Sequence, residues 1–89
     1  MQNPEISSIR AQIDEIDDEL LALINKRGEL SLKIRSVKKQ TNVPILDEER
    51  EAQVIERLVK KNFGPISDEQ VGQIFQSLME QMRAIRSSD

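Results

Sequence analysis

An apolar stripe in the first half of the chain constrains its fold more than any other feature. Apolar residues recur there at intervals of three and four, at Ile9, Ile13, Ile16, Leu20, Leu23, Leu30, Ile34 and Val37. This spacing puts them on one face of an α-helix, in a pattern resembling the seam of a coiled coil. It predicts one long helix from about Glu5 to Gln40, whose seam is interrupted once, by Arg27.

The predicted helix is longer than the rest of the chain can cover. A helix of about 33 residues extends for about 50 Å, at about 1.5 Å per residue. A compact chain of 89 residues has a radius of gyration of only about 12 Å, and a core of this size is marginal by itself. We therefore expect a homodimer in which the long helices of two copies are intertwined.

A second helix is predicted after a break in the stripe. Asn42 suits a turn, and Pro44 keeps its predecessor out of helical geometry. Asp47 is then expected as the N-cap of a helix that runs to about Asn62, with Gly64 as its left-handed cap. The predicted apolar face of this helix consists of Val54, Ile55, Leu58 and Val59.

A third helix is predicted from a capping box that Ser67 and Gln70 form, with Ile66 and Val71 at the positions of a hydrophobic staple. Its expected inward stripe consists of Val71, Ile74, Phe75, Leu78, Met82 and Ile85. The helix is expected to fray near residues 86–88. The predicted fold is all-α, with three helices per chain, in a single domain of residues 1–89.

The composition excludes several kinds of chemistry. The chain has no cysteine and no histidine, which excludes disulfides, thiolate nucleophiles, imidazole bases and the usual zinc sites. Its net charge of −3 argues against nucleic acid or an anionic membrane as a partner, because both are held mainly by positive charge. No apolar run approaches the roughly 20 residues that span a bilayer, and no signal peptide is evident, so a cytoplasmic protein is expected.

Three cationic residues of the first helix are candidates for binding an anion. Arg27 either fixes the register of the seam, extends its head into solvent or binds a ligand. Lys38 lies eleven residues further on, which is three turns to within about 20°, so both side chains can converge on one small anion. Arg10 is about 25 Å from Arg27 along the axis, so it can reach the same ligand only across an antiparallel dimer.

The charged run at the start of the second helix divides by helical spacing. Asp47 and Glu51 lie one turn apart on the stripe that continues into the apolar face, with Arg50 beside them. A glutamate on the buried side needs a partner or a hydroxyl group to bind. Glu48 and Glu49 are expected to be ordinary solvated charges.

Four segments together resemble the all-helical chorismate mutases over nearly the whole chain: "IR" at Ile9–Arg10, "IDEIDDELLALINKRGEL" around Arg27, "IRSVKKQ" with Lys38, and "VPILDEERE". The resemblance implies an intertwined homodimer with shared active sites. It also implies an isomerase that converts chorismate to prephenate on the way to phenylalanine and tyrosine. That rearrangement is pericyclic and implies no cofactor and no metal.

The resemblance also implies roles for individual residues. Arg27 and the partner's Arg10 would bind the two carboxylates of the dianionic substrate, and Lys38 would bind the ether oxygen and a nearby carboxylate. Glu51 would accept a hydrogen bond from the ring hydroxyl, helped by the backbone at Asp47. Arg50, which precedes Glu51, would complete the polar wall of the site with its guanidinium group.

The third helix departs from the family pattern. Seven and eleven positions after Phe75, the family usually has a small residue and then Gln or Glu. This chain has Met82 and Arg86 there. Met82 removes a hydrogen bond and adds bulk at the substrate. Arg86 either donates to the ether oxygen or turns into solvent.

Two alternatives to chorismate mutase activity stay open. Because the third helix is altered, the chain could be an isochorismate pyruvate lyase or a 4-amino-4-deoxychorismate mutase of the same fold. It could also be a non-catalytic dimerisation or regulatory module that serves a larger aromatic-pathway enzyme as partner. In that interpretation Arg27 acts only on the register of the helices.

Overall fold

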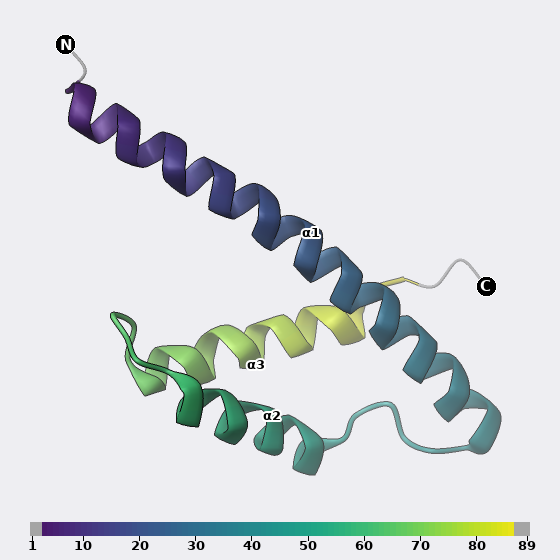
Figure 1. Cartoon of the computed structure of the whole chain (residues 1–89). Helices are drawn as coiled ribbons and strands as arrows, with labels where there is room; N and C mark the ends of the chain where they lie inside the picture. Colours follow the sequence, from purple (N-terminus) through teal and green to yellow (C-terminus); the bar gives the residue numbers. More distant parts are fainter. Residues whose placement is uncertain (1–2, 87–89) are drawn as a thin grey trace. The chain divides into compact units, whose positions relative to one another are not determined.

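The computed structural model describes residues 3–86, and these residues form three helices and no strand. The helices are α1 (Pro4–Thr41), α2 (Glu48–Lys61) and α3 (Asp68–Ala84) (Figure 1). The prediction of an all-α chain with one long first helix is confirmed. Its predicted start and end, Glu5 and Gln40, are each one residue from the observed ones.

The chain divides into two units, residues 1–30 and residues 31–89, with the boundary inside α1. The first unit contains the amino-terminal part of α1. The second contains the remainder of α1 together with α2 and α3. That residues 1–89 act as a single domain stays a prediction.

In the first unit, the apolar stripe of α1 is exposed. Ile9, Ile16 and Leu23 are 55%, 61% and 63% exposed, although their spacing is that of a buried face. The helix begins with a side-chain cap, since the N–H of Glu5 donates to Oδ1 of Asn3 at 2.8 Å. The helix is thus well started locally, whereas its apolar face has no cover among the residues of its own unit.

The connection from α1 to α2 agrees with the predicted break. Asn42 has a left-handed backbone (φ 58°), a conformation that asparagine tolerates better than most residues. The N–H of Val43 donates to the carbonyl of Lys38 at 2.9 Å, which closes the end of α1. Asp47 is confirmed as the N-cap of α2, because its Oδ1 accepts from the N–H of Arg50 at 3.0 Å.

The turn between α2 and α3 differs from the prediction at one position. The C-cap of α2 is Asn62, with an extended backbone, and Gly64 lies two residues further on with φ 78°. The assignment of Gly64 as the helix cap was therefore wrong. The side chain of Asn62 organises the turn instead, accepting from the N–H of Gly64 at 3.0 Å and donating to Ile66 O at 2.9 Å and Asp68 Oδ1 at 3.0 Å.

The capping box of α3 is confirmed in both directions. The Ser67 hydroxyl accepts from the N–H of Gln70 at 3.1 Å, and the Gln70 side chain accepts from the N–H of Ser67 at 2.9 Å. Two N–H groups that the first turn of a helix leaves without partners are satisfied in this way.

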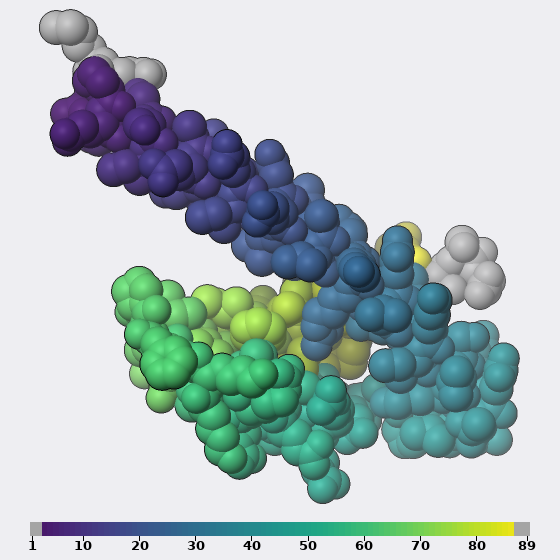
Figure 2. Space-filling view, in the orientation of Figure 1, coloured from purple at the N-terminus to yellow at the C-terminus, as the bar shows by residue number. Residues whose placement is uncertain are grey.

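The core lies between α2 and α3, which pack against each other (Figure 2). Its most buried members, all 5–6% exposed, are Val54, Val71, Met79 and Met82. Ile74 was expected in the inward stripe but is 52% exposed, and Met79, which the sequence did not indicate, is buried. The buried face of α3 is turned toward Met79, the side on which Gly72 faces Ile55 of α2.

Among the described helices, none contains an apolar stretch long enough to cross a bilayer.

Candidate active site

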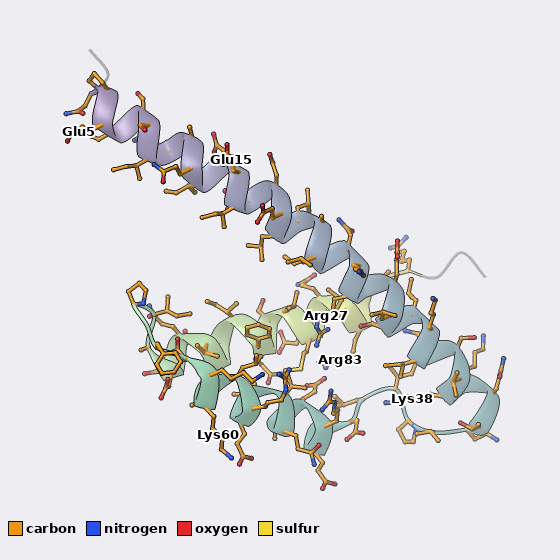
Figure 3. All side chains as sticks on the ribbon, viewed as in Figure 1. Glu5, Glu15, Arg27, Lys38, Lys60 and Arg83 are labelled. Atoms are coloured by element: carbon orange, nitrogen blue, oxygen red, sulfur yellow. The ribbon has the colours of Figure 1, made fainter. Side chains whose placement is uncertain are left out.

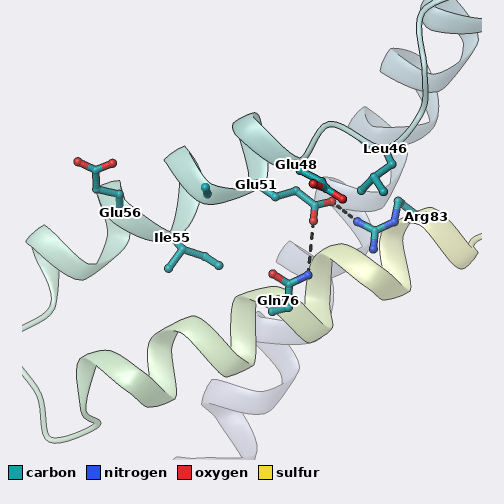
Figure 4. A pocket seen from close by; sticks show the side chains of 8 residues that line it. Leu46, Glu48, Glu51, Ile55, Glu56, Gln76 and Arg83 are labelled. Carbon is teal, nitrogen blue, oxygen red and sulfur yellow. Dashed lines mark hydrogen bonds and ion pairs between the residues drawn. The ribbon is translucent and has the colours of Figure 1, made fainter.

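A pocket of about 560 Å³ lies between α2 and the face of α3 opposite it (Figure 4). Its lining consists of Leu46, Glu48, Glu51, Ala52, Ile55, Glu56, Gln76 and Arg83. The α2 members follow one another at helical spacing, so one face of that helix supplies them. Glu48, expected to be simply solvated, lies on this face and lines the pocket.

Glu51 is the carboxylate with the most contacts in this pocket. It accepts from Nη1 of Arg83 and, at 3.5 Å, from Nε2 of Gln76 (Figure 4). The side chains of Glu51 and Arg83 are only 16% and 29% exposed. A partly buried carboxylate needs such donors to offset its lost hydration. Arg83 and Gln76 of α3 are the polar partners that Glu51 was expected to require.

Arg83 and Gln76 were not among the residues that the sequence indicated. They are seven residues apart on α3, which is about two turns, so both point the same way. This spacing beside the apolar face is the signal that could have identified them. The sequence alone, however, does not show that α2 presents a carboxylate opposite them.

The pocket lining is negative in formal charge. Three glutamates and one arginine line it, and the arginine is already paired with Glu51. Such a lining repels a dianion. An anionic ligand therefore requires cations from beyond this lining.

Lys38 is one of the predicted cations that lie in the same unit as the pocket. It is half-buried, and its Nζ donates to the carbonyl of Ile45 at 3.3 Å (Figure 3). Ile45 precedes Leu46, which lines the pocket. Lys38 is therefore held against the segment that leads into the pocket.

Asp47 and Arg50, the other predicted residues at the start of α2, are both exposed. They are joined by the N-cap hydrogen bond, in which Arg50 uses its backbone N–H and Asp47 its carboxylate. Neither residue lines the pocket that Glu51 lines.

The two unusual residues of the third helix lie in different surroundings. Met82 is buried in the core between α2 and α3 and does not line the pocket. Arg86 is exposed and follows the end of α3 at Ala84. Fraying was expected near residues 86–88. Of these, Arg86 lies two residues beyond the end of α3, and residues 87–88 lie outside the described part of the chain.

The remaining predicted residues, Arg10 and Arg27, lie on α1 in the first unit. Arg10 is exposed and Arg27 is half-buried. Within residues 3–86, the side chains of Arg10, Arg27, Arg50 and Arg86 make no hydrogen bond or ion pair. Arginine stays charged at any ordinary pH, so these four permanent cations are free to bind an anion.

A known protein family matches almost the whole chain. The model of the family "Chorismate mutase type II" matches residues 9–87. The chorismate mutase of Methanocaldococcus jannaschii is 37% identical over 83 residues, which cover 92% of this chain and 84% of that protein. The bifunctional chorismate mutase/prephenate dehydratase of Pseudomonas aeruginosa is 31% identical over 86 residues, and the match covers 91% of this chain and 24% of that protein.

Solved structures show the same likeness. A chorismate mutase (form II) from Thermus thermophilus superimposes with a TM-score of 0.89 at 26% identity, covering 91% of this chain and 92% of that chain. A chorismate mutase from Helicobacter pylori, in complex with prephenate, has a TM-score of 0.69 at 28% identity, covering 96% of this chain and all of that chain.

Proposed function

The chain belongs to the chorismate mutase type II family, whose model matches residues 9–87, and we propose that it rearranges chorismate to prephenate in active sites shared by two copies. In this reaction a C–O bond breaks while a C–C bond forms, without a covalent intermediate. No nucleophile or acid–base residue is required. A chain without cysteine or histidine therefore has the side chains that the reaction needs.

The rearrangement depends on binding and electrostatics. The site has to hold a flexible dianion in its reactive, chair-like shape and stabilise the negative charge that grows on the ether oxygen. Arginine and lysine supply this stabilisation. The unpaired guanidinium groups of the chain support the proposal, because they offer the positive charge that the pocket lining lacks.

We assign the cations as follows. Arg27 and the partner's Arg10 bind the two carboxylates, and Lys38 binds the ether oxygen and a neighbouring carboxylate. The contact of Lys38 with the segment beside the pocket supports its assignment. Arg50 completes the polar wall, supported by the lack of any competing side-chain partner for it among residues 3–86.

The observation that carries the proposal is the position of Glu51 in the pocket. Two side chains of α3 fix its carboxylate there. A carboxylate has about four lone-pair positions, so it can still accept the hydrogen bond of the substrate's ring hydroxyl. The backbone of Asp47 helps to set its position, because Glu51 N–H donates to Asp47 O at 3.0 Å.

The homodimer is supported by the exposed stripe of α1. Its isoleucines and leucines form an exposed apolar stripe that only Arg27 interrupts, and large exposed apolar surfaces usually mark an interface. The proposed role of Arg10 also requires a second copy, since within one helix Arg10 and Arg27 are about 25 Å apart. Met82, in this proposal, shapes the apolar side of the site from the core behind the pocket.

The product is proposed to enter the synthesis of phenylalanine or tyrosine. The bifunctional relative supports this step, because its name joins chorismate mutase with prephenate dehydratase. An enzyme that uses prephenate is accordingly the proposed partner. The cytoplasmic location expected from the sequence stays a prediction.

Incubation with chorismate tests the proposed function directly. We expect the absorbance of chorismate to fall at a rate proportional to enzyme concentration, with prephenate as the product. Glu51→Gln, which replaces the carboxylate assigned to the ring hydroxyl, is the matched variant for testing the site. Absence of turnover at micromolar enzyme contradicts the proposal, and turnover of isochorismate or 4-amino-4-deoxychorismate in its place assigns the chain to one of the alternative reactions.

A further inference from the structure

Arg35 joins α1 to the end of α3 through three side-chain hydrogen bonds. Its Nη1 donates to the carbonyl of Ile85 at 2.6 Å. Its Nη2 donates to the carbonyls of Met82 at 2.7 Å and Arg83 at 3.1 Å. One guanidinium on α1 thus binds three carbonyls at the carboxyl end of α3. Within the described residues, no other hydrogen bond joins α1 to α3.

This contact supplements the C-cap of α3. The last four carbonyls of a helix have no partner within the helix, and many helices resolve this with a glycine just after their end. The end of α3 has no glycine, and its C-cap is Ile85 with an extended backbone. The rigid, planar guanidinium binds three carbonyls there, of which Met82 O also accepts from the N–H of Ile85 at 3.3 Å, and its charge complements the negative end of the helix.

The capped end of α3 is also the end that reaches Glu51. The carbonyl of Arg83 accepts from Arg35. The side chain of Arg83 donates to Glu51 (Figure 4). A short series of contacts therefore runs from α1 to the carboxylate in the pocket. Arg83 lies within α3 and contacts Glu51. Arg86 lies beyond the end of α3 at Ala84 and beyond its C-cap, Ile85.

We propose that Arg35 is a positioning residue for Glu51, acting through the carboxyl end of α3 and through Arg83. The inference rests on the proposed function, since Glu51 is the group assigned to the substrate's hydroxyl. Neither Arg35 nor Arg83 needs to touch the substrate in this role. Together they fix where the carboxylate stands and keep its remaining lone pairs directed at the ligand.

A double-mutant cycle on chorismate turnover tests the proposal. Arg35→Gln and Arg83→Gln are each expected to lower kcat/KM by about 10- to 100-fold, because displacement of a binding group by about 1 Å can cost that much. The double variant is expected within about threefold of Arg83→Gln alone, since coupled residues are not additive. Losses that multiply in the double variant overturn the proposal, because a merely structural role for Arg35 does not depend on Arg83.

Arg57→Gln is the matched control for the lost charge. Arg57 is exposed on α2 and makes no side-chain hydrogen bond or ion pair with any of residues 3–86. Its substitution is expected to leave turnover unchanged. If Arg35→Gln fails to fold, Arg35→Lys takes its place in the cycle, because lysine keeps the charge but cannot form the fork that binds three carbonyls.

Amide hydrogen exchange tests the cap without a turnover assay. Arg35→Gln is expected to speed exchange at residues 82–85, and Arg57→Gln is not. Unchanged exchange there overturns the proposal even if the wild-type protein converts chorismate. Conversely, a wild-type protein without turnover overturns the proposed function, and the exchange result then still decides whether Arg35 caps α3.

Discussion

The amino-terminal part of α1 and the pair of α2 and α3 have similar sequence patterns and different surroundings. Both carry apolar residues at helical spacing. Val54, Val71, Met79 and Met82 of α2 and α3 are buried against each other, whereas the members of the α1 stripe before residue 30 are about half exposed or more. The difference teaches that periodicity shows which face a helix must bury, and that only the chain's length and connections show whether it can bury that face alone.

Glu51 and the two arginines of α1 that are assigned to the proposed site differ in the same way. In the α2–α3 pair, Glu51 has Arg83 as its partner. On α1, Arg10 and Arg27 have no side-chain partner among residues 3–86. An unpaired arginine on an exposed apolar face is explained if a second copy of the chain covers the face and a dianionic ligand pairs with the arginine.

The strongest test of this comparison is a charge introduced into the apolar stripe of α1. Leu20→Asp is expected to dissociate the proposed dimer and to reduce turnover to background, because each proposed site uses residues from both copies. Full burial of one leucine stabilises by about 1.5–3 kcal/mol, and the dimer loses two such side chains while burying two carboxylates. Sedimentation and chorismate turnover, measured on the same sample, check both expectations.

Ala22→Asp is the control for this variant. It introduces the same charge about 200° around the helix from Leu20, on the exposed opposite face. We expect it to keep both the dimer and the turnover. Dissociation by Ala22→Asp would mean that the stripe is not the face that the second copy covers.

Arg27→Ala separates the two interpretations of the seam. As a substrate ligand, Arg27 is expected to contribute about 100- to 1,000-fold to turnover, the usual effect of removing one preorganised donor. The dimer should stay intact. Lys26→Ala, an exposed neighbour on α1, is the control. A changed dimer stability with little loss of turnover supports the register role and contradicts the ligand role.

The course of the helices could be predicted from the sequence because local chemistry determines it. Asp47 and Ser67 mark the starts of α2 and α3, and both side chains accept the N–H bonds expected of N-caps. Gly64 shows the limit of such rules. Its positive φ was foreseen, but the side chain of Asn62 makes the hydrogen bonds of the turn, and its reach across four and six residues is not a property of any short motif.

The pocket could be predicted only in part, for a related reason. Glu51 was indicated because a carboxylate on an apolar face is costly. Arg35 and Arg83 were not, since they are 2 of 13 lysines and arginines, and the spacing of Arg83 from Gln76 does not show that a carboxylate lies opposite them. Their contacts join residues 32 to 50 positions apart, and only the packing of the helices brings these together.

Met79 and Ile74 sharpen the description of the α2–α3 core. Because Met79 is buried and Ile74 is half exposed, Met79→Ala is expected to lower the free energy of unfolding by about 2–5 kcal/mol. Ile74→Ala, the residue that periodicity alone favours for the core, is expected to cost less. Chemical denaturation of both variants at one protein concentration measures the difference. A larger loss for Ile74→Ala would show that its surface is covered in the assembled protein.

The smallest effect is expected at the start of α3, where the comparison concerns local structure alone. Ser67→Ala removes the hydroxyl that accepts from Gln70 N–H, so the free energy of unfolding should fall by about 1 kcal/mol, within the usual range for N-caps. Ser77→Ala, at an exposed position inside the same helix, should have little effect. Turnover is expected to persist in both variants, because the capping box lies at the opposite end of α3 from Arg83. If Ser67→Ala lowers turnover as strongly as Arg83→Gln, the two ends of α3 are not independent, and α3 positions Glu51 as a whole helix rather than through its capped end.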